Sequence, residues 1–197
     1  IGRARVFDGE NSLLDSLTNE PHIFKNHDMI VVRYEGPSGA PGMPEMLDST
    51  SRITTLCREK GIIVGLMTDA RFSGGSVGLV IGHVGPEAAL GGEIAFIQDG
   101  DEIIVDLNIN ELNCTELFDS SILNERKLAW EKIVNSNNGI HPSVGRADTR
   151  LLNRMRLSAV SAKLGAGMHP SRELWVSDPR DPIRTDFIPS NKFRAGT

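Results

Sequence analysis

The sequence of 197 residues has no apolar stretch long enough to cross a bilayer and no segment built like a signal peptide. Cysteine is scarce: Cys57 and Cys114 cannot form a disulfide framework, and they match none of the paired spacings that bind zinc. Aromatic residues make up only 5% of the chain. These absences exclude a helical membrane protein and a disulfide scaffold. We expect a soluble protein of the cytoplasm, or of an organelle matrix in a eukaryote.

The residues that are present describe an ordinary globular protein, with 39% hydrophobic and 24% charged side chains. Charge is unevenly distributed, because residues 1–140 hold 11 basic and 21 acidic side chains, whereas residues 141–197 hold 10 basic and 5 acidic ones. The net charge of -5 and the spaced arginines argue against nucleic-acid binding. We expect a domain over residues 1–138, and a basic extension over residues 139–197 that docks on the acidic body or on another subunit.

The pattern of apolar residues, glycines and prolines predicts a mixed α/β fold. The expected elements are a strand at 29–34, a glycine-rich loop at 35–44, a helix at 45–60, a strand at 61–67, a second glycine loop at 68–78, a hairpin of 94–97 with 103–105, and helices at 121–135 and 148–164 followed by a proline-punctuated extended tail. Because both glycine loops follow strands, we expect them to lie side by side at one end of a sheet.

Finer expectations follow for individual residues. Pro44 suits the first turn of the helix at 45–60, and Gly61 suits its C-terminal cap. Cys57 on this helix and Cys114 on a strand fit small core residues. The helix at 121–135 is expected to bury four apolar side chains: Leu123, Trp130, Ile133 and Val134.

The first glycine loop contains one candidate metal ligand. The loop lacks the Gly-Lys-Ser/Thr ending of a P-loop, and its glycines miss the dinucleotide-binding spacing. Glu45, at the junction of this loop with the following helix, can bind a hard cation such as Mg²⁺. A carboxylate in this position more often serves as a favourable charge in the first turn of a helix.

The second glycine loop places Ser73 between Arg71 and three glycines, directly after a buried strand. Ser73 has no histidine beside it and no Gly-x-Ser-x-Gly elbow, so an acyl-transfer hydrolase is poorly supported. A bound cation can activate such a serine by lowering the pKa of its hydroxyl. An ordinary surface turn explains the same residues equally well. His83 fits a hydrogen-bonded structural histidine better than a base.

Four motifs occur in order along the chain: RYEGP at 33–37, PGMPEML at 41–47, TDARFSGG at 68–75 and GHVGPEAA at 82–89. In order and spacing they resemble the C-terminal part of the dihydroxy-acid and sugar-acid dehydratases, the family that also contains phosphogluconate dehydratase. The resemblance covers roughly residues 3–135. It implies a swivelling β/β/α domain with a barrel-like sheet and flanking helices, packed against a large N-terminal α/β domain.

The resemblance also implies a reaction and its cofactors. Enzymes of this family remove water from a 2,3-dihydroxy carboxylic acid to give a 2-keto acid, using Mg²⁺ and an iron-sulfur cluster of the 2Fe-2S or 4Fe-4S type. By position, Ser73 resembles the base that takes the proton from C2, and Glu45 resembles a Mg²⁺ ligand. Arg71, Gly74, Gly75 and Ser76 are expected to bind substrate, with Arg71 neutralising a carboxylate or pairing with Asp69. Supporting roles are expected for His83, Asp69 and Glu35.

The family's cluster-binding cysteines and its other Mg²⁺ ligands belong to the N-terminal domain, which this sequence does not contain. The chain begins with Ile1 and not with methionine, so we expect a piece of a longer protein. The resemblance implies that this protein is a homo-oligomer. Alone, it should be inactive even with iron, sulfide and Mg²⁺ supplied. Keto-acid formation by the purified 197-residue chain would contradict this expectation.

Three interpretations of the function stay open: two differ in the substrate of the enzyme, and in one the chain is not an enzyme. Ala70 in the serine motif and the long extension containing residues 148–152 favour an aldonic acid such as xylonate or gluconate. The alternative substrate is the dihydroxy acid of branched-chain amino-acid biosynthesis. A third possibility is a non-catalytic module whose glycine loops grip a small anion and whose basic tail recruits a partner.

Overall fold

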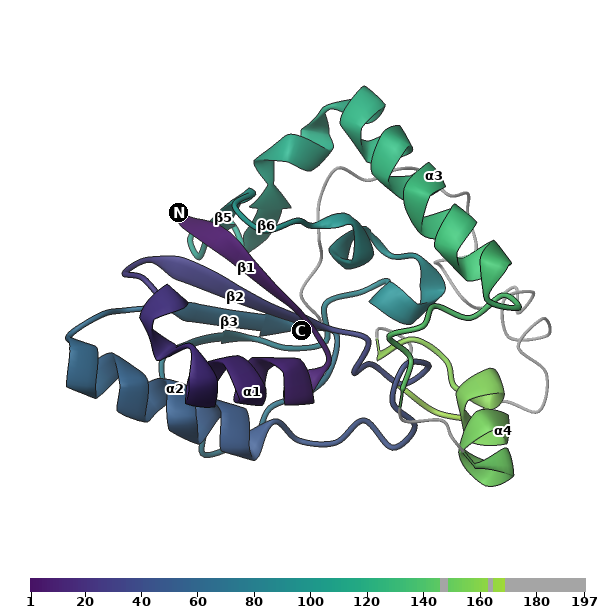
Figure 1. The fold of residues 1–197 in the computed structure, drawn as a ribbon, viewed down its shortest axis with the longest axis horizontal. Coiled ribbons are helices and arrows are strands. Elements are labelled where there is room, and N and C mark those ends of the chain that lie inside the picture. The colour runs from purple at the N-terminus through teal and green to yellow at the C-terminus, as the bar shows by residue number, and fades with distance from the viewer. Residues whose placement is uncertain (146–148, 163–164, 169–197) are drawn as a thin grey trace.

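The computed structural model describes residues 1–145, 149–162 and 165–168. They form a mixed α/β fold around a curled sheet of six strands (Figure 1). In chain order the strands and α-helices are β1 (Gly2–Asp8), α1 (Glu10–Asn19), β2 (Asp28–Arg33), α2 (Leu47–Lys60), β3 (Gly65–Thr68), β4 (Leu79–Ile81), β5 (Glu102–Asp106), β6 (Glu111–Cys114), α3 (Ser120–Ser136) and α4 (Arg150–Ser158). The α/β class expected from the sequence is confirmed.

The sheet has the strand order β4-β3-β2-β1-β5-β6. Strands β1 to β4 run parallel to their neighbours, whereas β5 pairs antiparallel with both β1 and β6. Parallel neighbours share one carboxyl edge, and the loops that follow β2 and β3 therefore begin next to each other. This arrangement positions the candidate site.

Both faces of the sheet are covered, which explains the continuous apolar runs of the central strands. Side chains alternate along β2: Met29 and Val31 belong to one buried cluster, and Ile30 and Val32 belong to the other. Helices α1 and α2 lie side by side on the second face, as Figure 1 shows. Gly61 caps α2 in the left-handed conformation with φ 64°, as the sequence predicts.

The first face is covered by α3 together with two short 3₁₀ helices, Ala88–Leu90 and Glu93–Phe96. The second of these helices corrects the expected hairpin, because residues 94–97 form no strand. The Arg33 guanidinium donates to the carbonyl oxygens of Ala95 and Ile97 at 2.6 and 3.0 Å. These contacts direct the carbonyls of this segment toward Arg33, while the backbone itself adopts the 3₁₀ conformation. The hairpin is formed instead by β5 and β6.

The two C-terminal helices differ from expectation in detail. Helix α3 buries no residue completely; Leu123 and Trp130 pack against the core, but Ile133 is 43% exposed. Helix α4 is shorter than the predicted 148–164, because it starts after Thr149, whose hydroxyl accepts from the Leu152 amide, and ends before Ala159, which bridges Met168. The extended tail predicted beyond this point lies outside the described residues.

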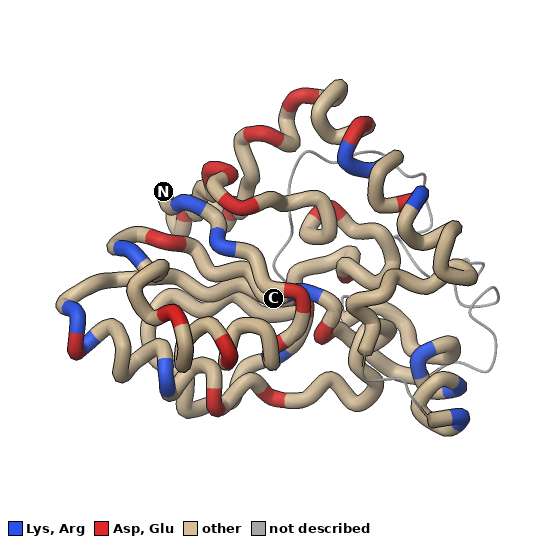
Figure 2. Tube along the Cα trace, viewed as in Figure 1, with Lys and Arg blue, Asp and Glu red and all other residues tan. Residues whose placement is uncertain are grey.

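Charged side chains are distributed unequally over the fold. Figure 2 shows both signs mixed over the sheet, α2 and α3, whereas α1 carries only acidic residues and α4 carries basic residues, namely Arg150, Arg154 and Arg156. Within the described ranges, no helix has both the length and the apolar character needed to cross a membrane.

Candidate functional site

The two glycine loops lie against each other, as the sequence predicts. Glu45 and Arg71 form an isolated parallel bridge between the loop after β2 and the loop after β3. The Met46 amide donates to the Arg71 carbonyl at 3.4 Å, and Arg71 Nε donates to the Met43 carbonyl at 2.7 Å. These contacts hold the segment before α2 beside the segment that leads to Ser73.

Glu45 is not in the first turn of a helix. The bridge to Arg71 keeps it extended, and α2 begins two residues later at Leu47. Its Oε1 lies 3.6 Å from Arg71 Nη1, and the two side chains are 46% and 45% exposed. Because so exposed an ion pair contributes little free energy, the carboxylate stays accessible to a cation. The helix-charge explanation of Glu45 is therefore wrong for this fold.

Ser73 follows this bridge by two residues and is half-buried. Its Oγ accepts from the Gly75 amide at 3.3 Å, and its carbonyl accepts from the Ser76 amide at 3.1 Å. A β-carbon placed on Gly74 would meet nothing within 4 Å. The serine thus sits in a tight turn with one open side. Among the described residues, no side chain hydrogen-bonds its hydroxyl, so the group that activates this serine has to come from elsewhere.

A hollow of about 230 Å³ borders the same loop. One wall is the segment 75–77, and the other is the polar face of α2. The lining side chains include Thr50, Thr54, Arg58 and Ser76. The open side of the serine loop therefore continues into a polar cleft. A second hollow, of about 170 Å³, is lined by apolar residues such as Ile63, Leu79 and Leu107 and lies away from these loops.

Asp69, which directly follows β3, is completely buried and does not pair with Arg71. Its carboxylate accepts three backbone amides: Tyr34 at 3.1 Å, Glu35 at 3.0 Å and Ala88 at 2.9 Å. Burial raises the pKa of Asp69 to about 6, against the opposing effect of these hydrogen bonds. Asp69 therefore connects three segments of backbone, and Arg71 is left to Glu45.

Glu87 is a buried carboxyl that the sequence analysis did not single out. Its Oε2 accepts the amides of Ser38 at 2.8 Å and Gly39 at 3.1 Å, whereas its Oε1 is buried with no hydrogen-bond partner among the described residues. Burial first, and then the charge of Asp69, raise the pKa of Glu87 to about 7. A charged residue inside the mostly apolar motif at 82–89 was the available signal.

The remaining candidates surround these carboxyls. Glu35 is buried, and its Oε1 accepts the Glu10 amide at 2.8 Å, which ties the loop to the start of α1. His83 has a left-handed backbone with φ 57°, its amide donates to the Ala70 carbonyl at 2.8 Å, and its Nδ1 is buried without a hydrogen-bond partner. Both residues thus lie close to the backbone of the two loops.

The cysteines do not fit an iron-sulfur cluster. Cys114 belongs to the buried cluster on one face of the sheet, and Cys57 packs against the cluster on the other face. Burial raises the pKa of both thiols, that of Cys114 to about 12. Two protonated thiols separated by a sheet cannot jointly hold a cluster, so their expected role as core residues is the one that fits.

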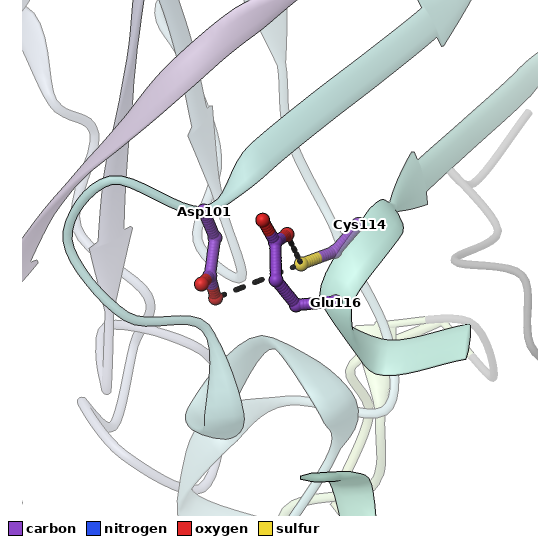
Figure 3. Close-up of side chains that lie close together, drawn as sticks. All are labelled: Asp101, Cys114 and Glu116. Carbon is purple, nitrogen blue, oxygen red and sulfur yellow. Dashed lines mark hydrogen bonds between the residues drawn. The ribbon is translucent and has the colours of Figure 1, made fainter. Parts of the chain in front are cut away.

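In the part of the chain that the structure describes, one further group has metal-ligand chemistry: Asp101, Cys114 and Glu116 converge where β5 begins and β6 ends (Figure 3). The Cys114 thiol lies 3.7 Å from Asp101 Oδ2 and 3.6 Å from Glu116 Oε2. The Arg126 guanidinium already binds Asp101 through both nitrogens, at 2.5 and 3.0 Å. This internal cation neutralises Asp101, and the group is a structural ion pair with a neutral thiol beside it.

Fold and loops together define an α/β domain that presents a serine and an accessible carboxylate on adjacent loops at one edge of its sheet. Residues 1–166 match the family described as dihydroxy-acid/6-phosphogluconate dehydratase, C-terminal. The chain belongs to this family, as the four motifs predict.

The chain also resembles individual proteins of this family. The chain is 44% identical over 151 residues to a dihydroxy-acid dehydratase of Methanospirillum hungatei, covering 75% of the chain and 26% of that protein. It is 48% identical to one of Acaryochloris marina and 49% identical to one of Prochlorococcus marinus, each match covering 66% of the chain and 22% of the relative. The chain thus spans about a quarter of the length of these relatives.

Proposed function

We propose that the chain is the C-terminal part of a hydro-lyase that removes water from a 2,3-dihydroxy carboxylic acid and yields a 2-keto acid. The observation that carries this proposal is the bridge between Glu45 and Arg71, which brings the carboxylate of one loop beside the loop of Ser73. The family membership and the names of the relatives support it.

The residues of this chain fit part of a Mg²⁺ site. Glu45 offers an exposed carboxylate oxygen, the kind of ligand that a hard cation takes, while the other ligands would come from outside these residues. A bound Mg²⁺ supplies positive charge that lowers the pKa of a nearby hydroxyl and neutralises the substrate carboxylate. Glu45 would hold it, in competition with Arg71. No step is assigned to an iron-sulfur cluster, since the two cysteines do not fit one.

The roles of this chain's residues follow from the loop. Ser73 Oγ, as the alkoxide, takes the proton from C2, and the C3–O bond breaks. The departing hydroxide takes up this proton to leave as water, which restores the alkoxide, and the resulting enol tautomerises to the 2-keto acid. Gly74, Gly75 and Ser76 line the open side of the turn, where a substrate can approach the backbone closely. Arg71, released from Glu45, can pair with a substrate carboxylate.

The substrate we propose is the branched-chain dihydroxy acid. The relatives named above are called dihydroxy-acid dehydratases, which favours this alternative over the aldonic acid expected from the sequence. Ala70, one basis of the aldonate expectation, is completely buried and packs in the core, so it is poorly placed to select a substrate.

The anion-gripping module is less well supported than the enzyme. A grip on an anion needs free backbone amides, and in the first loop the amides of Tyr34, Glu35, Ser38 and Gly39 are occupied by the chain's own carboxylates. An N-terminal domain that completes the site, a swivelling β/β/α domain and a homo-oligomer remain part of our proposal, and the greater length of the relatives supports the first of these.

The test is an assay of the full-length protein, prepared without oxygen and supplied with Mg²⁺. We expect keto acid to form from 2,3-dihydroxyisovalerate at a kcat/KM about 100-fold above that on xylonate or gluconate, because hydroxyl-binding sites discriminate strongly. Faster turnover of an aldonate would overturn the substrate assignment. Absence of keto acid from all three compounds would overturn the dehydratase proposal itself.

A further inference from the structure

Two buried carboxyls, which we call the carboxylate clamp, grip a single turn of backbone. Asp69 accepts the amides of Tyr34 and Glu35, and Glu87 accepts those of Ser38 and Gly39. Four amides of the loop that leads from β2 to Glu45 are thus bound to side chains from the loops after β3 and β4. Consecutive amides that converge on one oxygen anion form a nest.

The glycines of this loop are explained by the clamp. A β-carbon on Gly36 would lie 2.6 Å from Glu87 Oε2 and 3.0 Å from Glu87 Cβ. A β-carbon on Gly39 would lie 2.4 Å from the Tyr34 carbonyl oxygen. The turn can close around the Glu87 carboxylate only if both positions lack a side chain. These glycines therefore allow the loop to bind the chain's own Glu87 carboxyl.

The backbone that carries Glu87 is itself anchored, by the 3₁₀ turn that follows it. The Glu87 carbonyl accepts the amides of Leu90 and Gly92 at 3.0 and 3.1 Å, which anchors its backbone. The Ala88 amide donates to Asp69, so the two acids are connected through adjacent residues. Asp69 lies four residues before Ser73 on the same chain segment. A shift of either acid would move the first loop relative to the serine.

We propose that Glu87, together with Asp69, is a positioning residue that holds the loop leading to Glu45 in register with the loop carrying Ser73. The catalytic consequence rests on the dehydratase function proposed above, whereas the structural consequence does not. Misplacing catalytic groups by about 1 Å can cost about 100-fold in rate. Glu87 touches neither loop's reactive group, so it acts through the backbone.

The hydrogen bonds distinguish the two acids. Glu87 uses one oxygen, Oε2, and a glutamine amide oxygen can accept the same two bonds. Asp69 uses both oxygens, so asparagine would turn an amide donor toward backbone donors. Burial also keeps Glu87 partly protonated near neutral pH, a state that glutamine resembles. Glutamine at position 87 should therefore preserve the clamp.

The experiment compares Glu87→Met, which keeps the size but removes the acceptor, with Glu87→Gln in the full-length protein. We expect Glu87→Met to lower kcat about 10- to 100-fold with a small change in KM, and Glu87→Gln to stay within about 3-fold of the wild type. Amide hydrogen exchange supplies a second readout that does not need activity. In Glu87→Met, the amides of Ser38 and Gly39 should exchange at least about tenfold faster, with β1 unchanged.

Each outcome has a meaning. Unchanged exchange at Ser38 and Gly39 in Glu87→Met would overturn the clamp, and so would equal acceleration in β1, because that pattern indicates general destabilisation. Impairment of Glu87→Gln as severe as that of Glu87→Met would also overturn it. An inactive wild-type protein would defeat the dehydratase proposal, yet the exchange measurements would still decide for or against the clamp.

Discussion

Replacing Ser73 with alanine in the full-length protein is expected to lower kcat for dehydration about 1,000-fold, within the range that a general base contributes. The folded structure should tolerate the change, because Ser73 is half-buried and its Oγ makes a single hydrogen bond to the described residues, accepting from the Gly75 amide at 3.3 Å. The measurement is keto-acid formation at saturating substrate. Urea unfolding of the same variant checks that its stability is preserved.

A second readout identifies the step. If Ser73 removes the C2 proton, the variant should also stop exchanging the C2 hydrogen of the substrate with solvent deuterium. Ser12→Ala, on the exposed side of α1, is the matched control and should behave as the wild type. A Ser73→Ala enzyme that keeps more than a tenth of the wild-type kcat would exclude this serine as the base.

The largest effect on stability is expected from Arg126→Met. Arg126 and Asp101 form a two-pronged ion pair in which the side chains are only 13% and 6% exposed. Removing the guanidinium leaves Asp101 buried beside Glu116 and the Cys114 thiol, and no other cation of the described residues pairs with it. We expect a loss of about 3–5 kcal/mol in the free energy of unfolding, measured by urea denaturation.

Lys127→Met is the matched control in the same helix. Lys127 pairs with Glu131 at 4.0 Å on the surface, and an exposed pair of this kind contributes about 0.3–0.5 kcal/mol. Methionine has nearly the same helix propensity as lysine and arginine, so the two variants differ mainly in the ion pair that is broken. If the loss in unfolding free energy for Arg126→Met exceeds that for Lys127→Met by less than about 1 kcal/mol, the buried ion pair does not stabilise the fold as expected.

The central part of the fold was predictable because its signals are local. The runs at 29–34 and 61–67 are apolar, and they overlap β2 (Asp28–Arg33) and β3 (Gly65–Thr68), which the sheet buries almost completely. The first residues of the second run precede the strand, and Ile63 is 71% exposed. Gly61 ends α2 as expected. The adjacency of the two loops followed from the order of strands and helix, since β2 and β3 are parallel neighbours.

The errors arose where distant residues decide. Residues 94–97 have the composition of a strand, but Arg33, some 60 residues earlier, binds their carbonyls. The start of α2 is set by the bridge to Arg71, which no helix signal near Glu45 reveals. The role of Glu87 could not be predicted from the sequence, because it depends on burial close to Asp69 and on close contact with the glycine loop at 35–44. Only the folded chain brings these segments together.

Trp130 lies beside Tyr34, whose backbone the carboxylate clamp binds, so its fluorescence can report on the clamp. Trp130 Nε1 donates to the Tyr34 hydroxyl at 3.1 Å, and the Tyr34 ring stacks on His141 with centroids 4.4 Å apart. The backbone amide of the same tyrosine is bound by Asp69. Because indole emission depends on local polarity, the fluorescence of Trp130 should change when the loop that begins at Tyr34 moves away from the clamp. Trp175, the only other tryptophan, can be replaced by phenylalanine to isolate the signal.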